Sequence, residues 1–283
     1  SVYSGLNNKL LPLLSLLRIA EKENTIINCF WSNYCWGNKK VNNNYHFLDL
    51  FESIKNIQFI SRDKFEVYYK SNNKIYNKNG SDRNRKEIIY YSNKNNNITV
   101  FYNIVHCISY LEDNIINYCV PYPSKKIYKN NFTNELKLVI KKLIPKKIIE
   151  QKIINNCKNI NFNKTLGIHI RLTDGGFKDL KYIDAFNYIT KFLEKNTEHK
   201  IYVATDDLKT EKKLKDNFNE KIITMTDYFG NYEDKVKNND NGLKNSVIEM
   251  SILSKCNIFI GTKGSSFSFM VWLMSNNDYL EFW

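Results

Sequence analysis

The chain has 283 residues, 42% of them hydrophobic and 14% aromatic. This composition excludes a disordered chain, and the length allows two domains of ordinary size or one large α/β unit. No apolar run approaches the roughly 18 residues of a membrane-spanning helix, so we expect a soluble domain without a membrane span. The first strand candidate, residues 1–3, is shorter than the usual length of about five residues, so we expect a piece of a longer protein. The sequence does not specify the compartment.

The formal net charge is +13, with 42 Lys and Arg against 29 Asp and Glu. A clustered basic surface would favour nucleic-acid binding, because cations displace counterions from phosphates. Arginine, which reads bases and clamps phosphates bidentately, is rare, whereas Lys accompanies a great excess of Asn and Ile. We therefore expect no nucleic-acid partner, and a partly basic cleft for an anionic small molecule fits the charge equally well. The arginines are Arg18, Arg62, Arg83, Arg85 and Arg171.

The six cysteines contain no Cys-x-x-Cys pair and have no histidine at ligand spacing, so we expect no metal site. Their even number permits disulfides, but three of them fall in apolar strand or helix positions, where a buried thiol is usual.

The N-terminal half starts as a βαβ unit over residues 1–31, with a strand, a glycine loop, an apolar helix and a second strand. Residues 70–97 are polar and low in complexity, which predicts an exposed insertion or hairpin. Residues 98–119 and 132–157 favour helices. A domain junction is expected near residues 158–163.

From about residue 160, short apolar strands alternate with amphipathic helices, a pattern typical of βαβ units on a parallel sheet. We therefore predict a Rossmann-like domain over residues 161–283, preceded by an N-terminal domain over residues 1–160. The predicted strands are 165–172, 200–206, 221–226, 257–262 and 278–283, and the helices between them are 184–196, 210–218, 243–256 and 266–275.

Ligands of open α/β sheets bind outside the carboxyl ends of the strands, and four loops at such positions carry unusual polar residues. The first is SGLNNK, residues 4–9. Gly5 permits a tight turn, and Asn7 and Asn8 begin a helix whose N-terminal amides favour an anion. An ordinary helix-capping role explains the same asparagines.

The second loop follows the strand TLGIHIRL and continues as TDGG. Strand alternation places His169 and Arg171 on one face at the strand end. A guanidinium can clamp a diphosphate bidentately and stabilise it as a leaving group. The alternative is that Arg171 pairs with a structural carboxylate such as Asp174.

The third loop is YVATDD, where Asp206 or Asp207 could accept hydrogen bonds from guanine or from ribose hydroxyls, or could cap the next helix. The fourth is IGTKGSSFS, in which Gly264, Ser265 and Ser266 precede or begin a helix and predict a nest of backbone N–H donors for phosphate. A plain turn with a helix cap is the competing interpretation. Together the four loops predict a cleft between two domains that receives a nucleotide diphosphate.

GLNNK, GIHIRLTD, YVATDD and IGTKGSSFS resemble, in this order, the motifs of the inverting fucosyltransferase superfamily, which includes core α1,6-fucosyltransferases, nodulation fucosyltransferases and protein O-fucosyltransferases. The resemblance is strongest over residues 165–275 and weak from about residue 35 to 160. It implies an α/β, GT-B-like fold, in which two Rossmann-like domains turn parallel sheets to each other across a cleft. It also implies an acceptor side in residues 1–160, a nucleotide-sugar side in residues 161–283, GDP-fucose as donor substrate, inversion at the anomeric carbon, and no metal or other cofactor.

Matching positions assign roles by resemblance. Arg171 would bind the donor β-phosphate, and His169 would lie along the donor. Asp206 would contact the base or ribose, while Ser265 and Ser266 would approach the pyrophosphate.

The reacting centre is assigned by the same resemblance. Asn8 matches the glycine-loop asparagine near that centre. The α1,6 branch places an acidic residue ten positions after the motif histidine, where this chain has Asp179, a candidate general base with Asp174 as its rival. Leu172 stands where several relatives have a second arginine, although the O-fucosyltransferase branch tolerates an apolar residue there.

The expected function is metal-independent, inverting transfer of fucose from GDP-fucose to a hydroxyl of a glycan or protein acceptor. Two alternatives stay open, namely the same fold with another nucleotide sugar and a catalytically silent sugar- or nucleic-acid-binding module.

Overall fold

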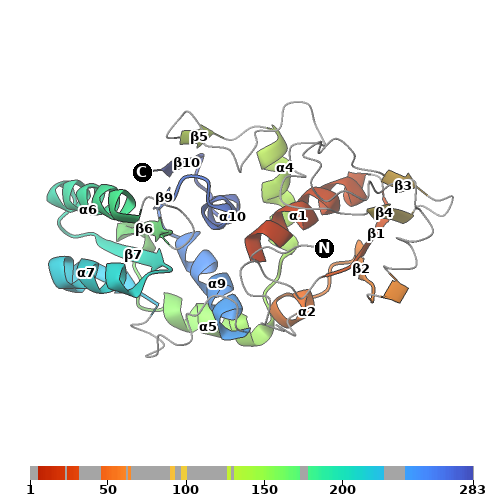
Figure 1. Ribbon diagram of the computed structural model, residues 1–283, viewed down its shortest axis with the longest axis horizontal. Helices are drawn as coiled ribbons and strands as arrows, with labels where there is room; N and C mark the ends of the chain where they lie inside the picture. The colour runs from red at the N-terminus through yellow and green to blue at the C-terminus, as the bar shows by residue number, and fades with distance from the viewer. Residues whose placement is uncertain are drawn as a thin grey trace.

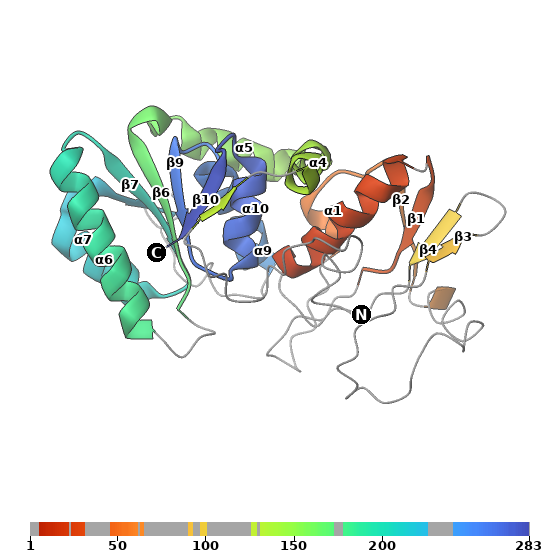
Figure 2. The same cartoon turned by 90° about the horizontal axis from the view of Figure 1, so that it is seen from above.

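The protein folds as two mostly parallel β-sheets with helices between and beside them, an α/β architecture (Figure 1). The computed structural model describes residues 6–22, 24–31, 46–61, 63–64, 90–92, 97–100, 126–128, 131–172, 178–225 and 240–282. Seen from above, the molecule is layered along its long axis, from the larger sheet through the helices on its inner face and α1 (Leu6–Lys22) to the smaller sheet (Figure 2).

The smaller sheet has the strand order β2-β1-β4-β3. Its parallel strands are β1 (Ile26–Cys29), β2 (Ile57–Phe59) and β4 (Asn97–Val100), and β3 (Tyr90–Ser92) runs antiparallel to β4. The β3–β4 pair forms a hairpin at the end of the polar segment 70–97, where the sequence predicted an insertion or hairpin. The helix predicted from residue 98 is wrong at its start, because the β-branched run Ile98–Val100 favours an extended chain. The helix α1 (Leu6–Lys22) precedes β1, and the short α2 (Phe47–Leu50) precedes β2.

The larger sheet has the order β5-β10-β9-β6-β7-β8. All of its strands are parallel except the edge strand β5, which pairs antiparallel with β10. The predicted strands of the C-terminal half are confirmed, whereas β5 precedes the expected division at residue 160, which stays a prediction. The strands are β5 (Lys126–Tyr128), β6 (Thr165–Ile170), β7 (Lys200–Thr205), β8 (Ile222–Thr224), β9 (Ile258–Gly261) and β10 (Tyr279–Phe282).

Helices cover both faces of this sheet (Figure 2). The outer face carries α6 (Lys178–Lys195) and α7 (Leu208–Phe218), and the inner face carries α5 (Lys147–Cys157), α9 (Asp240–Leu253) and α10 (Ser266–Met274). The helix predicted over residues 132–157 is interrupted. It is divided into α4 (Asn131–Val139), a 3-10 turn (Ile140–Lys142) and α5, because Pro145 cannot continue a helix.

Strand alternation sorts the residues of β6 between the two faces of the sheet. Leu166, Ile168 and Ile170 belong to the core cluster that includes residues of α6 and α7. The alternate residue Gly167 faces the C-terminal end of α9, and His169 faces α10. β6 therefore turns His169 toward the inner side, where α1 lies.

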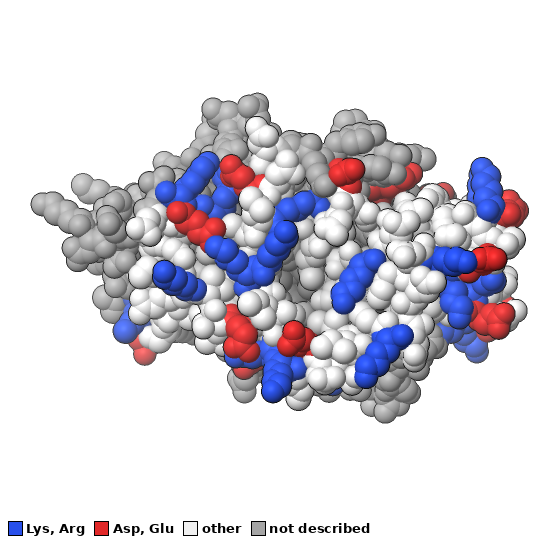
Figure 3. All heavy atoms as spheres, turned by 180° about the vertical axis from the view of Figure 1, so that it is seen from behind, with Lys and Arg blue, Asp and Glu red and all other residues white. Residues whose placement is uncertain are grey.

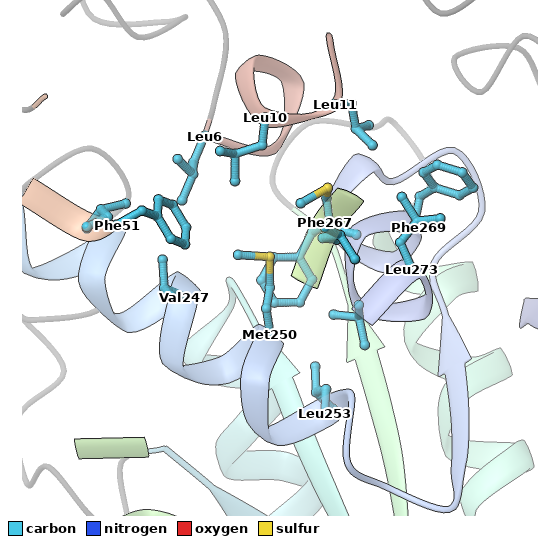
Figure 4. Close-up of a cluster of buried hydrophobic side chains, with 14 of the residues drawn as sticks. Leu6, Leu10, Leu11, Phe51, Val247, Met250, Leu253, Phe267, Phe269 and Leu273 are labelled. Carbon is cyan, nitrogen blue, oxygen red and sulfur yellow. The ribbon is translucent and has the colours of Figure 1, made fainter. Parts of the chain in front are cut away.

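A second, larger core cluster joins α1 to α9 and α10. Leu6, Leu10 and Leu11 of α1 face a group of side chains on α9 and α10 that includes Met250 and Phe267 (Figure 4). This packing brings the first turn of α1 against the inner helices of the larger sheet.

Charges on the face seen from behind are mixed. Lys and Arg are dispersed among Asp and Glu over the described part of this face, and they do not gather into one basic patch (Figure 3).

Candidate functional site

The strand order reverses direction at β6 and β9, and their carboxyl ends are therefore the candidate position for a ligand. The chain runs from β6 through β7 to β8 on one side and then returns to β9 on the other side of β6. Such a reversal opens a crevice at the strand ends, which is where open α/β sheets bind ligands. Ile168 pairs with Ile260 and Ile170 with Thr205, so the loops after β6, β7 and β9 are neighbours.

A hydrogen-bond network joins the ends of β6 and β9. The Thr262 hydroxyl donates to the carbonyl oxygen of His169 at 2.7 Å and accepts from the Arg171 backbone N–H at 3.1 Å. The Thr262 backbone N–H donates to Ser268 Oγ at 2.9 Å, and Ser268 Oγ lies 2.8 Å from His169 Nδ1. His169, Thr262 and Ser268 are buried and Arg171 is half-buried. The network therefore fixes the first turn of α10 relative to the predicted donor-binding residues His169 and Arg171.

The His169 ring also packs on an aromatic ring of α10. The ring centroids of His169 and Phe267 are 4.5 Å apart with 32° between the planes. The first turn of α10 therefore holds the imidazole in two ways, by this ring contact and by the hydrogen bond with Ser268.

Asp206 connects β7 to the segment that carries Arg171. Its Oδ1 accepts a hydrogen bond from the Leu172 backbone N–H at 2.8 Å. Asp207 has the capping role that the sequence left open, because its Oδ2 accepts from the Thr210 N–H at 2.8 Å as the N-cap of α7. Of the two carboxylates, Asp206 is thus the one at the strand-end site.

The loop between β9 and α10 has features of an anion site. Gly264 has φ +72°, a backbone conformation that favours glycine. Ser265 occupies the N-cap of α10, but its side chain makes no capping bond, and its buried Oγ has no hydrogen-bond partner among the described residues. Ser266 begins the helix and is half-buried. Helix N-termini attract anions, and a buried hydroxyl without a partner favours a ligand that supplies one.

The first turn of α1 holds a second buried polar atom without a described hydrogen-bond partner. Asn7 is buried, and its Oδ1 has no hydrogen-bond partner among the described residues. In the same turn the Lys9 ammonium lies 5.4 Å from the centroid of the Trp31 ring, which follows β1. Gly5 and the Asn8 side chain lie outside the described part of the structure.

The two candidate bases stay predictions. Asp174 lies outside the described residues, and Asp179 is in the first turn of α6 with its side chain outside them.

The sequence did not single out Thr262, Phe267 or Ser268. All three lie in the fourth predicted loop, IGTKGSSFS. The signal available for them was a hydroxyl at the end of one strand and a second hydroxyl one turn into the following helix, beside a strand that ends in histidine. Their contacts require β9 to lie beside β6, which the strand pattern did not specify.

The described cysteines are free thiols, and burial raises the pKa of Cys29 to about 12 and also raises the pKa of Cys256. Among the described residues, no three His, Cys, Asp or Glu side chains are grouped as metal ligands would be. No helix in the described ranges combines the length and apolar character needed to cross a membrane.

The fold combines two mostly parallel sheets, and the larger one carries the hydrogen-bonded residues at the carboxyl ends of β6 and β9. Among solved structures, the chain is similar to the NodZ α-1,6-fucosyltransferase soaked with GDP-fucose, with a TM-score of 0.60 and 14% identity over 97% of this chain and 90% of that one. For NodZ from Bradyrhizobium the TM-score is 0.61, with 13% identity over 97% and 91%. For NodZ co-crystallised with GDP it is 0.60, with 13% identity over 97% and 90%.

These likenesses confirm the predicted α/β, GT-B-like fold and the resemblance to the fucosyltransferase superfamily at the level of the fold. No protein-family model matches the sequence, and no curated protein matches it either.

Proposed function

We propose that the protein is a metal-independent, inverting fucosyltransferase that moves fucose from GDP-fucose to a hydroxyl of a glycan or protein acceptor. The observation that carries this proposal is the network joining His169 and Arg171 to the α10 N-terminus, at the strand reversal of a fold shared with NodZ.

The donor diphosphate is held by groups at this edge of the sheet. Arg171 binds the β-phosphate, while the N-terminus of α10 and the Ser265 hydroxyl bind the pyrophosphate. Asp206, whose Oδ1 accepts from the Leu172 N–H just after β6, contacts the base or ribose. Negative charge grows on GDP as it leaves, so fixed positive groups stabilise the transition state more than the ground state. Arg171 and the helix end supply this charge, and a metal ion is not required.

Transfer proceeds by one displacement. The acceptor oxygen attacks the anomeric carbon opposite GDP, a new C–O bond forms, and the bond between that carbon and the β-phosphate oxygen breaks, with its electron pair going to GDP. The acceptor proton moves to a carboxylate, either Asp179 or Asp174. A single displacement inverts the configuration at the anomeric carbon.

Thermal-shift titration with GDP, UDP and dTDP tests the donor class. A ligand at 100 times its Kd stabilises a protein by about 2.7 kcal/mol, so GDP is expected to raise Tm while UDP and dTDP leave it nearly unchanged. Stabilisation by UDP or dTDP instead would assign the fold to another nucleotide sugar. Binding of GDP without turnover of GDP-fucose would indicate a silent binding module.

Release of GDP from GDP-fucose in the presence of a glycan panel tests the chemistry. Arg171→Ala is expected to lower kcat/KM by about 10²–10³-fold, as does the loss of a key electrostatic donor in other enzymes. Arg171→Lys, which keeps the charge but not the fork geometry, is expected to retain an intermediate rate. EDTA should leave the rate unchanged. Full activity of Arg171→Ala would contradict the assigned role.

A further inference from the structure

The Ser268 hydroxyl has a limited set of partners. Ser268 is fully buried in the first turn of α10. Within the described part of the chain, its Oγ has two partners, the backbone N–H of Thr262 at 2.9 Å and Nδ1 of His169 at 2.8 Å. Other helical serines, such as Ser251, donate to the carbonyl four residues earlier, but Ser268 makes no such bond to a described residue.

These two partners fix the direction of the hydrogen bond between Ser268 and His169. The Thr262 N–H is a donor, so it occupies a lone pair of Ser268 Oγ and cannot take the hydroxyl proton. The acceptor left for that proton is His169 Nδ1. If Nδ1 carried its own proton, the Ser268 O–H would be buried without an acceptor, which costs about 1–3 kcal/mol.

We propose that Ser268 holds His169 as the neutral tautomer with its proton on Nε2, so that His169 serves the donor nucleotide as a hydrogen-bond donor and is not the base that accepts the acceptor's proton. The tautomer follows from the hydrogen bonds alone, and its role toward the nucleotide rests on the proposed function.

The surroundings of Ser268 keep its hydroxyl in this place. A Cβ at Gly261 would lie 2.7 Å from Ser268 Cβ, so glycine at that position admits the side chain. The Phe267 ring packs on the imidazole from the same turn. Ser268 is thus a positioning residue, because it acts on the nucleotide through His169.

The assignment narrows the choice of base. The one unprotonated nitrogen of this tautomer, Nδ1, already accepts from Ser268, and Nε2 carries a proton. The imidazole therefore has no vacant site for a proton from an acceptor hydroxyl, and Asp179 and Asp174 stay the candidate bases.

NMR of the full chain labelled with ¹⁵N-histidine tests the tautomer at about pH 8, where an ordinary imidazole, with pKa about 6.5, is neutral. The chain has four histidines, so the His169 signals are assigned by their loss in His169→Gln. We expect an unprotonated shift for Nδ1 and a protonated shift for Nε2. A proton on Nδ1 in the wild-type protein overturns the proposal, whether or not any variant folds.

Two variants test whether Ser268 itself fixes the His169 tautomer or whether any substitution near His169 changes it. Ser268→Ala should produce a mixture of tautomers. Thr262→Val removes hydroxyl bonds in the same corner but keeps the backbone N–H and Ser268, so it should retain the wild-type pattern. An unchanged spectrum in Ser268→Ala would overturn the role proposed for Ser268. A mixture of tautomers in Thr262→Val as well would also overturn it, because the tautomer would then depend on something other than Ser268.

Addition of GDP separates this inference from the proposed function. Bound GDP should move the Nε2–H signal while Nδ1 stays unprotonated. If GDP does not bind, the proposed function fails and the tautomer assignment stands. If GDP raises Tm but leaves the Nε2–H signal unmoved, the contact between His169 and the nucleotide is refuted while GDP binding stands.

Discussion

Gly261, the last residue of β9, leaves the space that the Ser268 side chain occupies. A Cβ at residue 261 would lie 2.7 Å from Ser268 Cβ and 2.9 Å from its Oγ. Gly261→Ala therefore pushes α10 away from β9 or turns the Ser268 hydroxyl from His169. We expect the free energy of unfolding, measured in urea, to fall by about 1–3 kcal/mol.

Gly264 provides a contrast in the same loop. A Cβ there has no described atom within 4 Å, but the backbone has φ +72°. Gly264→Ala should thus lose about 1–2 kcal/mol through backbone strain alone and keep the wild-type His169 tautomer. Gly264→Asn should recover part of this loss, since Asn tolerates this conformation. A Gly261→Ala protein as stable as wild type, with an unchanged His169 spectrum, would show that the corner accommodates the methyl group.

The residues of the site were predictable to different degrees. His169 and Arg171 were visible in the sequence because an imidazole and a guanidinium are unusual at the end of an apolar strand. The residues of the loop YVATDD alone left open whether Asp206 or Asp207 caps the next helix, and the start of α7 at Leu208 makes Asp207 the cap. The role of Ser268 depends on how closely β9 and α10 approach, and no local pattern encodes that distance.

At the scale of elements, Lys137 of α4 closes the C-terminal end of α10. Its ammonium donates to the carbonyl oxygens of Trp272 at 2.7 Å and Ser275 at 2.6 Å, and it lies 5.0 Å from the centroid of the Trp272 ring. The last carbonyls of a helix have no partner within the helix and carry partial negative charge. Lys137→Met keeps the apolar stem but loses these bonds, so we expect about 1–3 kcal/mol less stability in urea unfolding.

The matched control is Lys141→Met, an exposed lysine just after α4. It should change stability by less than about 0.5 kcal/mol. Equal effects of the two substitutions would mean that the cap on α10 contributes nothing specific.

The ion pair between α1 and α4 makes stability depend on pH. The hydrogen bond from Arg18, at 2.5 Å, holds the pKa of Glu135 below its ordinary value. Because the folded-state pKa is the lower one, the pair stabilises the fold above the unfolded carboxyl's pKa of about 4.3, and this contribution is lost as pH falls through the folded pKa. Glu135 is partly exposed and therefore screened, so Glu135→Gln should cost about 1 kcal/mol at pH 7.

Urea unfolding at pH 7 and pH 3 checks this dependence. The difference between wild type and Glu135→Gln should shrink at the lower pH. Glu198→Gln, which breaks the exposed pair with Lys164, should leave stability unchanged at both. The same loss in Glu135→Gln at both pH values would assign its effect to packing.

The elements of the C-terminal half were predictable because parallel strands covered on both faces read as short apolar runs between amphipathic helices. Pro145 was a signal for the break between α4 and α5, but the helical pattern on both sides of it led to the prediction of one continuous helix. β5 was not predictable, since three residues carry no periodicity and its pairing with β10 depends on the arrangement of the whole sheet.

At the scale of the whole molecule, α1 belongs to the N-terminal sequence but packs into a core shared with the other half. Leu10 and Leu14 are fully buried in the cluster that contains Met250 of α9 and Met270 of α10. A continuous apolar core makes separate opening of either half costly, because the shared surface would be exposed to water. The same packing holds the first turn of α1 against α9 and α10, the helices beside the proposed donor site (Figure 4).

We therefore expect the two sheets to unfold together. Leu214→Ala removes a fully buried side chain from the other core cluster, on the outer face of the larger sheet, and Leu10→Ala removes one from the shared core. Each should cost about 2–5 kcal/mol. Hydrogen exchange read by mass spectrometry should show the same loss of protection in β1 and β6 for either variant, since a cooperative unit opens with one free energy. If Leu214→Ala accelerates exchange in β6 and leaves β1 unchanged, the sheets open independently and α1 does not couple them.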